Sequence, residues 1–159
     1  MEELVINPEE KAVTAGQSSQ QTAEVARYVP STVAEVARKG QLFVQAEGVT
    51  GTSAAVACRY VSRSIVHSYA SKAISPSLTV QERLATAVKQ ATHDLYLRNN
   101  THPERRPVSV TTTAALIHNN TLIAAGCGDD RIYVVWDQDI ESLTPGGEES
   151  DSPVRVLSP

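Results

Sequence analysis

The feature that most constrains this chain is a short apolar strand that ends in an acid and two glycines and leads directly into a long helix. Residues 42–51 read Leu-Phe-Val-Gln-Ala-Glu-Gly-Val-Thr-Gly. From Thr52 to about Lys72, apolar residues recur every three or four positions and predict one buried helical face; they are Ala54, Ala57, Val61, Ile65 and Tyr69. This order places the Glu47 carboxylate and the Gly48 carbonyl at the carboxyl end of a strand, where a hard cation finds oxygen ligands.

The composition is that of a single globular domain without a strongly basic surface. The 159 residues are 41% hydrophobic and 20% charged, with a formal net charge of -4. This balance argues against nucleic acid or an anionic membrane as a main partner, because both attract clustered Lys and Arg. No apolar run predicts a membrane span, and the acidic start lacks the regions of a signal peptide. We therefore expect a cytoplasmic protein in which Cys58 and Cys127 are reduced core residues.

The rest of the sequence predicts a second helix and a group of strands. Thr79 and Glu82 form a capping-box pattern before a helix whose apolar face carries Leu84, Val88, Ala91 and Leu95. Further on, strands are predicted over Val108–Ile117, Thr121–Ala125 and Arg131–Trp136, the first two joined by a tight turn at Asn119–Asn120. Residues 23–29 and 33–38 are consistent with either strand or helix. We expect an α+β fold in which a helical layer covers a sheet.

One domain is expected over residues 1–144. Residues 145–159 are expected to form a linker or flexible tail, because Pro145–Asp151 is rich in proline, glycine and acids. A last strand is possible at Val154–Leu157.

Four stretches, taken in order, resemble the type 2C metal-dependent protein phosphatases (the PPM family). They are Ala46-Glu47-Gly48-Val49-Thr50-Gly51, Val110-Thr111-Thr112-Thr113-Ala114, Gly128-Asp129-Asp130-Arg131-Ile132-Tyr133 and Leu143-Thr144. In the family, the counterparts are a strand ending Ala-Asp-Gly-x-Gly-Gly, a Gly-Thr-Thr strand after two antiparallel helices, Gly-Asp-Ser-Arg and Leu-Thr. The resemblance implies an αββα sandwich with a metal pair at one edge of the β layers. Its motif positions here are Glu47, Gly48, Gly51, Thr112, Gly128, Asp129 and Arg131.

The same resemblance implies that the metal site is degraded. The family's first metal aspartate lies in an Asn-x-Asp-Ala stretch, and the matching residues 19–23 place Gln21 at that position. The family's phosphate-binding arginine has no counterpart, since no basic residue lies between Lys11 and Arg27. The bridging aspartate is replaced by Glu47. The remaining metal aspartates of the family lie further downstream than Pro159, so we expect the sandwich to be incomplete at its carboxyl end.

The number of charged ligands at the metal site favours a non-catalytic function. A dinuclear divalent site carries four positive charges and depends on several carboxylates, whereas one carboxylate, one carbonyl and a neutral amide remain here. We expect no bound cofactor and a non-catalytic pseudophosphatase that acts as a binding or regulatory module. The alternative is a Mn- or Mg-dependent protein serine/threonine phosphatase that takes its missing ligands from a longer chain or a second subunit. A protein partner or self-association is expected through exposed sheet edges.

Other candidate residues have simpler interpretations. Thr111–Thr113 with the strand that follows also resembles the amino-terminal strand of Ntn-hydrolases, where a threonine is activated by its own α-amine after cleavage of the chain. The alternative is that these threonines are β-forming residues within a strand. Asp129 and Asp130 are expected to shape a turn and pair with Arg131. The four histidines, His67, His93, His102 and His118, are expected on helix surfaces or beside turns rather than as catalytic acids.

Overall fold

The computed structural model describes residues 22–48, 53–71, 77–101, 107–128, 130–136, 139–143 and 154–157. Three predicted site residues, Gln21, Gly51 and Asp129, lie outside these ranges, as do His102 and Thr144.

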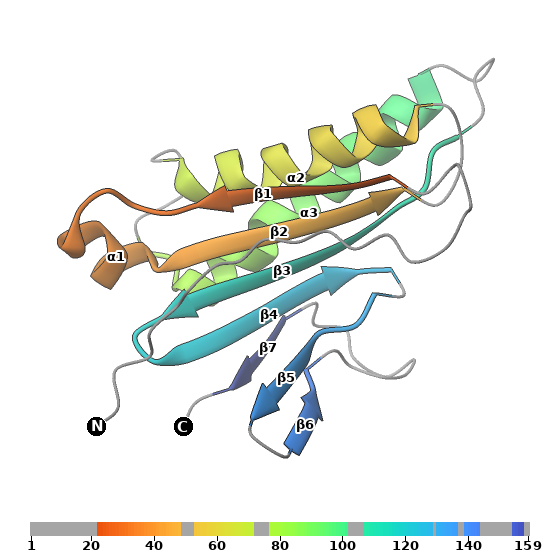
Figure 1. The fold of residues 1–159 in the computed structure, drawn as a ribbon. Helices are drawn as coiled ribbons and strands as arrows, with labels where there is room; N and C mark the ends of the chain where they lie inside the picture. Colours follow the sequence, from red (N-terminus) through yellow and green to blue (C-terminus); the bar gives the residue numbers. More distant parts are fainter. Residues whose placement is uncertain are drawn as a thin grey trace.

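Two long helices cover one face of a five-stranded antiparallel sheet (Figure 1). The sheet has the order β1-β2-β3-β4-β7 and consists of β1 (Thr22–Tyr28), β2 (Gln41–Gly48), β3 (Val110–His118), β4 (Thr121–Cys127) and β7 (Val154–Leu157). The helices are α2 (Ala54–Ala70) and α3 (Val80–Thr101), and a short helix, α1 (Val33–Lys39), connects β1 to β2. A separate two-stranded sheet pairs β5 (Tyr133–Trp136) with β6 (Asp139–Ser142).

The two ambiguous amino-terminal segments take different structures. Residues 22–28 form strand β1, which pairs with β2 along its whole length. Residues 33–39 form helix α1 because the Thr32 hydroxyl accepts a hydrogen bond from the Glu35 amide (3.3 Å), and Gly40 ends the helix. The predicted hairpin is confirmed: Asn119 (φ 48°) and Asn120 (φ 60°) both adopt the left-handed conformation that a two-residue hairpin turn requires.

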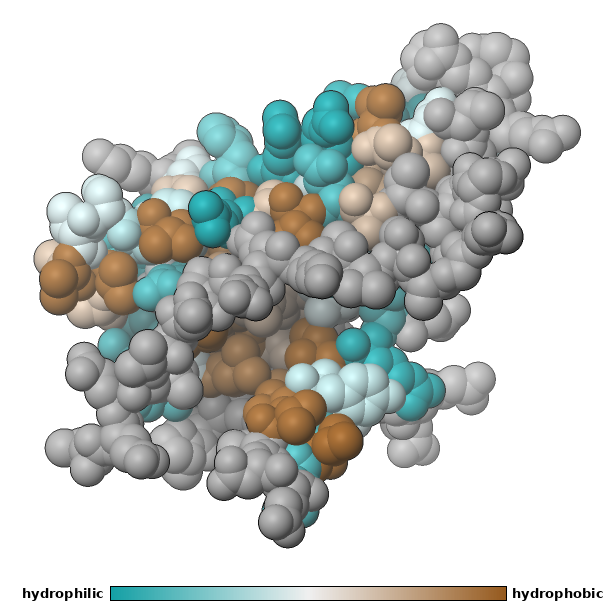
Figure 2. Space-filling model, in the orientation of Figure 1, coloured by the Kyte–Doolittle hydropathy of each residue, from teal (hydrophilic) through white to brown (hydrophobic). Residues whose placement is uncertain are grey.

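The core lies between the helices and the sheet. Along β2, buried positions alternate with more exposed ones, so every second residue faces the helical layer. Both predicted helical stripes are confirmed, and their buried members meet the strands in one cluster: Leu42, Val44, Val61, Ile65, Tyr69, Leu84, Val88, Ala91, Ala114, Leu116 and Ile123. The opposite, outer surface of α2 is largely hydrophilic (Figure 2). The fold therefore follows from helices and strands that each bury one face.

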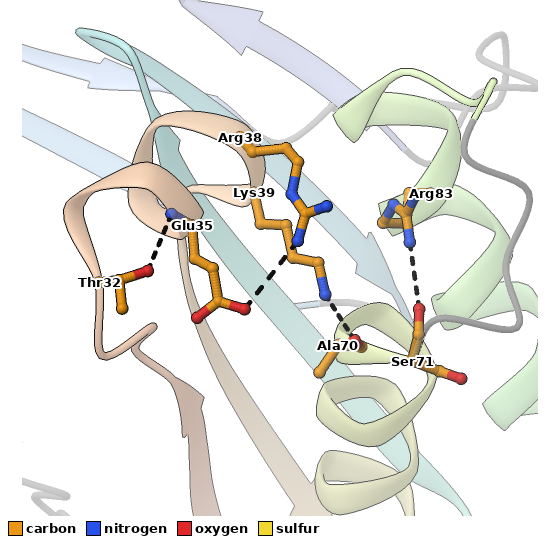
Figure 3. A network of polar contacts seen from close by, with 7 residues as sticks. All are labelled: Thr32, Glu35, Arg38, Lys39, Ala70, Ser71 and Arg83. Atoms are coloured by element: carbon orange, nitrogen blue, oxygen red, sulfur yellow. Dashed lines mark hydrogen bonds and ion pairs between the residues drawn. The ribbon is translucent and has the colours of Figure 1, made fainter.

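Polar contacts hold the carboxyl end of α2 against α1 and α3 (Figure 3). The Lys39 ammonium donates to the Ala70 carbonyl (2.7 Å), and the Arg83 guanidinium donates to the Ser71 carbonyl (3.3 Å). Both cations lie where helix carbonyls lack partners and the helix dipole is negative. The Tyr69 hydroxyl donates back to the Lys39 carbonyl, and burial raises the pKa of Tyr69. Lysine at position 39 is thus buried because it caps a neighbouring helix.

The predicted capping box at the start of α3 is confirmed. The Glu82 amide donates to the Thr79 hydroxyl (3.2 Å), and the Thr79 amide donates to the Glu82 carboxylate (2.9 Å). These hydrogen bonds, the backbone one first, lower the pKa of Glu82. Each partner therefore satisfies an amide that the helix itself leaves unpaired.

We predict that Thr79→Ala lowers the free energy of unfolding by about 1 kcal/mol, because the helix loses its cap. The effect of Glu82→Gln should depend on pH. Since the pKa of Glu82 is lower in the folded state than in the unfolded state, its contribution is present above the unfolded pKa and is lost as the pH falls through the folded pKa. Urea denaturation at about pH 7 and about pH 3 measures this. Lys89→Ala, at an exposed position of the same helix, is the control.

Candidate functional site

The predicted motif residues meet at one end of the five-stranded sheet. The carboxyl ends of β2 and β4 and the amino end of β3 lie together there because the strands are antiparallel. Glu47 pairs with Thr111 on β3 and with Ala23 on β1, while Thr112 pairs with Cys127 on β4. The chain leaves β4 through Gly128 and reaches Arg131, which is exposed.

The motif residues Glu47 and Thr112 lie on different faces of the sheet. Thr112 is only 3% exposed and shares the helical face with Ala46, its partner on β2. Glu47 is one residue further along β2, so its side chain lies on the opposite face, together with that of its partner Thr111. The Thr112 hydroxyl and the Glu47 carboxylate therefore lie on opposite sides of the sheet.

Two residues that the sequence analysis interpreted separately, Thr113 and Asp130, come together on the Glu47 face. Thr113 pairs with Gln45 and lies on the same face as Glu47. Its hydroxyl donates to a carboxylate oxygen of Asp130 (3.4 Å). The two-residue alternation along β3 indicates which face the Thr113 side chain lies on. Its contact with Asp130, in contrast, depends on the path of the chain after β4. The partner described for Asp130 is therefore Thr113, and no ion pair with Arg131 is found within the described residues.

The glycines of the motif are explained by packing. A Cβ atom at Gly48 would lie 2.7 Å from the Ala54 Cβ and 3.1 Å from the Cys58 Sγ, because the start of α2 rests directly on this end of β2. A Cβ atom at Gly128 would lie 2.7 Å from the Thr111 Cγ2. Both glycines thus permit a close approach of backbone and neighbouring side chains, whatever ligand the site takes.

His118 ends β3 directly before the Asn119–Asn120 turn, as expected. Its Nε2 lies 2.9 Å from the Ala37 carbonyl oxygen. Because a carbonyl oxygen can only accept a hydrogen bond, the Nε2–H group of His118 is the donor in this contact with α1. His67 and His93 are exposed on α2 and α3, in agreement with the expectation of helix-surface positions.

Among the described residues, few carboxylates lie close to Glu47, and that of Asp130 is on the same face of the sheet, 3.4 Å from the Thr113 hydroxyl. The cross-strand neighbours of Glu47 are Ala23 and Thr111, and Thr111 in turn contacts Gly128, so this row carries one carboxylate. Glu24 is adjacent to the row but pairs with Ala46 in register, on the helical face, and its carboxylate contacts Arg59 (3.4 Å). Within the described ranges, no group of three or more His, Cys, Asp or Glu side chains could hold a metal ion. Two Mg²⁺ or Mn²⁺ ions need several such oxygen ligands.

The threonines of β3 are interior residues of a strand that pairs on both sides. Thr111, Thr112 and Thr113 all pair with β2, and Thr112 and Thr113 also pair with β4. This is the position expected of β-forming residues in the middle of a sheet.

None of the helices in the described ranges combines the length and the hydropathy of a membrane span.

Comparison with known proteins identifies the fold. No protein-family model matches the sequence, and no curated protein does. Among solved structures, a variant of a bacterial serine phosphatase matches with a TM-score of 0.66 at 19% identity, over 86% of this chain and 63% of that chain. The serine/threonine phosphatase Stp1 of Staphylococcus aureus matches with a TM-score of 0.57 at 18% identity, over 84% of this chain and 57% of that chain.

A third match is the Mycobacterium tuberculosis serine/threonine phosphatase PstP, with a TM-score of 0.55 at 22% identity, over 79% of this chain and 54% of that chain. Another structure of PstP is a complex with 2 manganese ions. The chain spans roughly half to two thirds of the length of these structures. The predicted phosphatase fold is confirmed over that part: the described residues supply one helical layer, the five-stranded sheet and the β5–β6 pair.

Proposed function

Since the chain has the fold of the bacterial serine/threonine phosphatases, we propose that it acts as a binding or regulatory module and does not hydrolyse phosphoesters by itself. The observation that supports this proposal is the composition of the row across the end of the sheet. Ala23, Glu47, Thr111 and Gly128 lie side by side there and contribute one carboxylate, and the second described carboxylate on this face, that of Asp130, accepts a hydrogen bond from Thr113. A fold alone licenses no chemistry, so the side chains at the site decide the function.

The physical reason is the charge of the metal pair. Two divalent cations held close together repel each other and lose hydration, and carboxylate ligands offset both costs. The hydroxyl of Thr111 and the carbonyl of Gly48 are neutral ligands, so they offset much less of the repulsion between the cations and of their lost hydration. Without bound divalent ions, no group at the site lowers the pKa of a water molecule enough to supply hydroxide at neutral pH. A pseudophosphatase is the function that follows.

A second candidate function is hydrolysis by a Mn- or Mg-dependent protein phosphatase that receives further ligands from another part of a longer chain or from a partner. The observation that favours it is the retained acid–glycine pair, Glu47 and Gly48, at the end of β2. In that case Glu47 would act as a ligand, and its oxygens would be essential.

Calorimetric titration with Mn²⁺, combined with hydrolysis of p-nitrophenyl phosphate, tests whether this chain holds two ions and hydrolyses phosphoesters by itself. We expect no tight site for two ions and no hydrolysis above the buffer rate, both unchanged in Glu47→Gln. Glu141→Gln, which alters an exposed carboxylate on β6, is the matched control. Two tightly bound ions per chain, with hydrolysis that Glu47→Gln abolishes and Glu141→Gln preserves, would establish the phosphatase instead.

We also propose a protein partner, or a second copy of the chain, that covers the β5–β6 pair. Val135 and Ile140 are directly paired and are 69% and 71% exposed, and Tyr133 on the same face is 54% exposed. An apolar face of a two-stranded sheet gains stability when another surface covers it. Sedimentation velocity over a range of concentrations tests self-association. Ile140→Lys should reduce it, and an unassociated wild-type chain would leave the face to a different protein.

A further inference from the structure

The solvent-facing side of α2 is basic in a chain that is acidic overall. The helix contains Arg59, Arg63 and His67 on exposed positions and no Asp or Glu in its 17 residues. The whole chain, in contrast, has a formal net charge of -4. In Figure 2, hydrophilic side chains gather along the upper edge, over α2, and an apolar group lies near the helix's amino-terminal end. The exposed face of α2 therefore carries two arginines and a histidine with no acidic residue in the same helix.

These side chains line a shallow, open groove of about 510 Å³; the lining residues are Val56, Arg59, Tyr60, Arg63, Ser64 and His67. Val56, at one end, is 71% exposed. The guanidinium carbon of Arg98, from α3, lies 3.8 Å from the centre of the Tyr60 ring, so the ring is held by a cation–π contact. One part of the groove is therefore apolar and aromatic, and the other part carries Arg59, Arg63 and His67.

The cations are available to a partner. Arg63 makes no ion pair with any residue of the described ranges. Arg59 contacts Glu24 at 3.4 Å, but its side chain is 60% exposed, and a pair of this kind contributes at most about 1 kcal/mol. A carboxylate from outside could therefore replace Glu24 at little cost.

We propose that this α2 groove binds an acidic segment of another protein, with one apolar side chain against Val56 and Tyr60 and successive carboxylates against Arg59, Arg63 and His67. The spacing supports carboxylates: residues 59 to 67 span about 12 Å along the helix axis, so the charges are spread rather than converged on one phosphate. Nucleic acid is a poorer fit, because it rewards many more cations and offers no apolar side chain for Val56. The inference uses the exposed face of α2 and its neighbours Glu24 and Arg98, and it holds whether or not the domain hydrolyses phosphoesters.

Fluorescence anisotropy with defined probes tests the proposal. The acidic probe is a short fluorescein-labelled peptide in which one leucine precedes several glutamates. Its comparison probes are the same peptide with glutamine for glutamate, a peptide with a single phosphoserine, and a single-stranded oligonucleotide. Arg63→Glu should weaken binding of the acidic peptide roughly three- to tenfold, whereas Lys89→Glu, with the same charge change outside the groove, should weaken it less than about twofold.

Two further variants test the details of the site. Val56→Asp should weaken binding by removing the apolar contact and adding repulsion. Glu24→Gln should tighten it, because Arg59 is then no longer shared with an internal carboxylate. Circular dichroism melting confirms that each variant is folded. Equal weakening by Arg63→Glu and Lys89→Glu, tighter binding of the phosphoserine peptide or the oligonucleotide, or no binding of the acidic peptide would each overturn the proposal.

Discussion

Gly40→Ala is expected to lower the free energy of unfolding by roughly 3–5 kcal/mol, combining backbone strain with a steric clash. Gly40 ends α1 with φ 70° and ψ −167°, a conformation that residues with a Cβ atom rarely adopt. Its amide donates to the Val36 carbonyl (2.7 Å), which fixes the turn into β2. An added Cβ would collide with the Ile117 carbonyl oxygen and lie 3.0 Å from the His118 Cβ. Neither neighbour can move without disturbing β3.

Urea denaturation of Gly40→Ala measures this loss, with Gly126→Ala as the control. Gly126 receives the same substitution on the neighbouring strand β4, where a Cβ would lie 3.2 Å from the Thr112 carbonyl oxygen. That contact requires a shift of only a few tenths of an ångström, so the control should lose much less stability. A Gly40→Ala protein that unfolds at the wild-type urea concentration would contradict the described turn between α1 and β2.

Gly48→Val is the second substitution with a large expected effect, about 3 kcal/mol or more. The first side-chain carbon would lie 2.7 Å from the Ala54 Cβ, and the two further methyl groups would meet the same packed start of α2. Moving α2 away would separate Ala57, Val61 and Ile65 from the core that they fill. The site end of β2 and the position of the helix are thus coupled by one close contact.

A double-mutant cycle isolates this contact. Gly48→Ala alone should destabilise the fold, and Ala54→Gly alone should cost up to about 1 kcal/mol because glycine is a poor helix former. Together, the two changes should cost less than their sum, since removing the Ala54 Cβ makes room for the new one. Additive losses would show that the Ala54 Cβ is not the atom that requires glycine at position 48, and would leave the Cys58 Sγ, 3.1 Å from an added Cβ, as the obstacle.

The candidate site was predicted only in part. Glu47 and Gly48 could be placed at a strand end from the apolar run before them and the helix after them. That Thr112 faces the helices while Thr113 shares a face with Glu47 follows from strand register, which a single sequence does not specify without its partner strands. The contact of Thr113 with Asp130 joins residues 17 positions apart through the path that the chain takes beyond β4.

The sequence by itself determined the features that depend on residues within a turn or two of each other. These are the apolar stripes of α2 and α3, the Thr79–Glu82 capping box and the Asn119–Asn120 turn, and the motif order from which the fold was recognised. Only the tertiary structure decided that Lys39 caps α2 through Ala70, that Ala23 and Thr111 flank Glu47, and that Arg98 holds Tyr60 beside the basic groove. Those contacts join distant segments, and their partners are set by packing and register, whereas the local features are set by backbone geometry that neighbouring residues impose on one another.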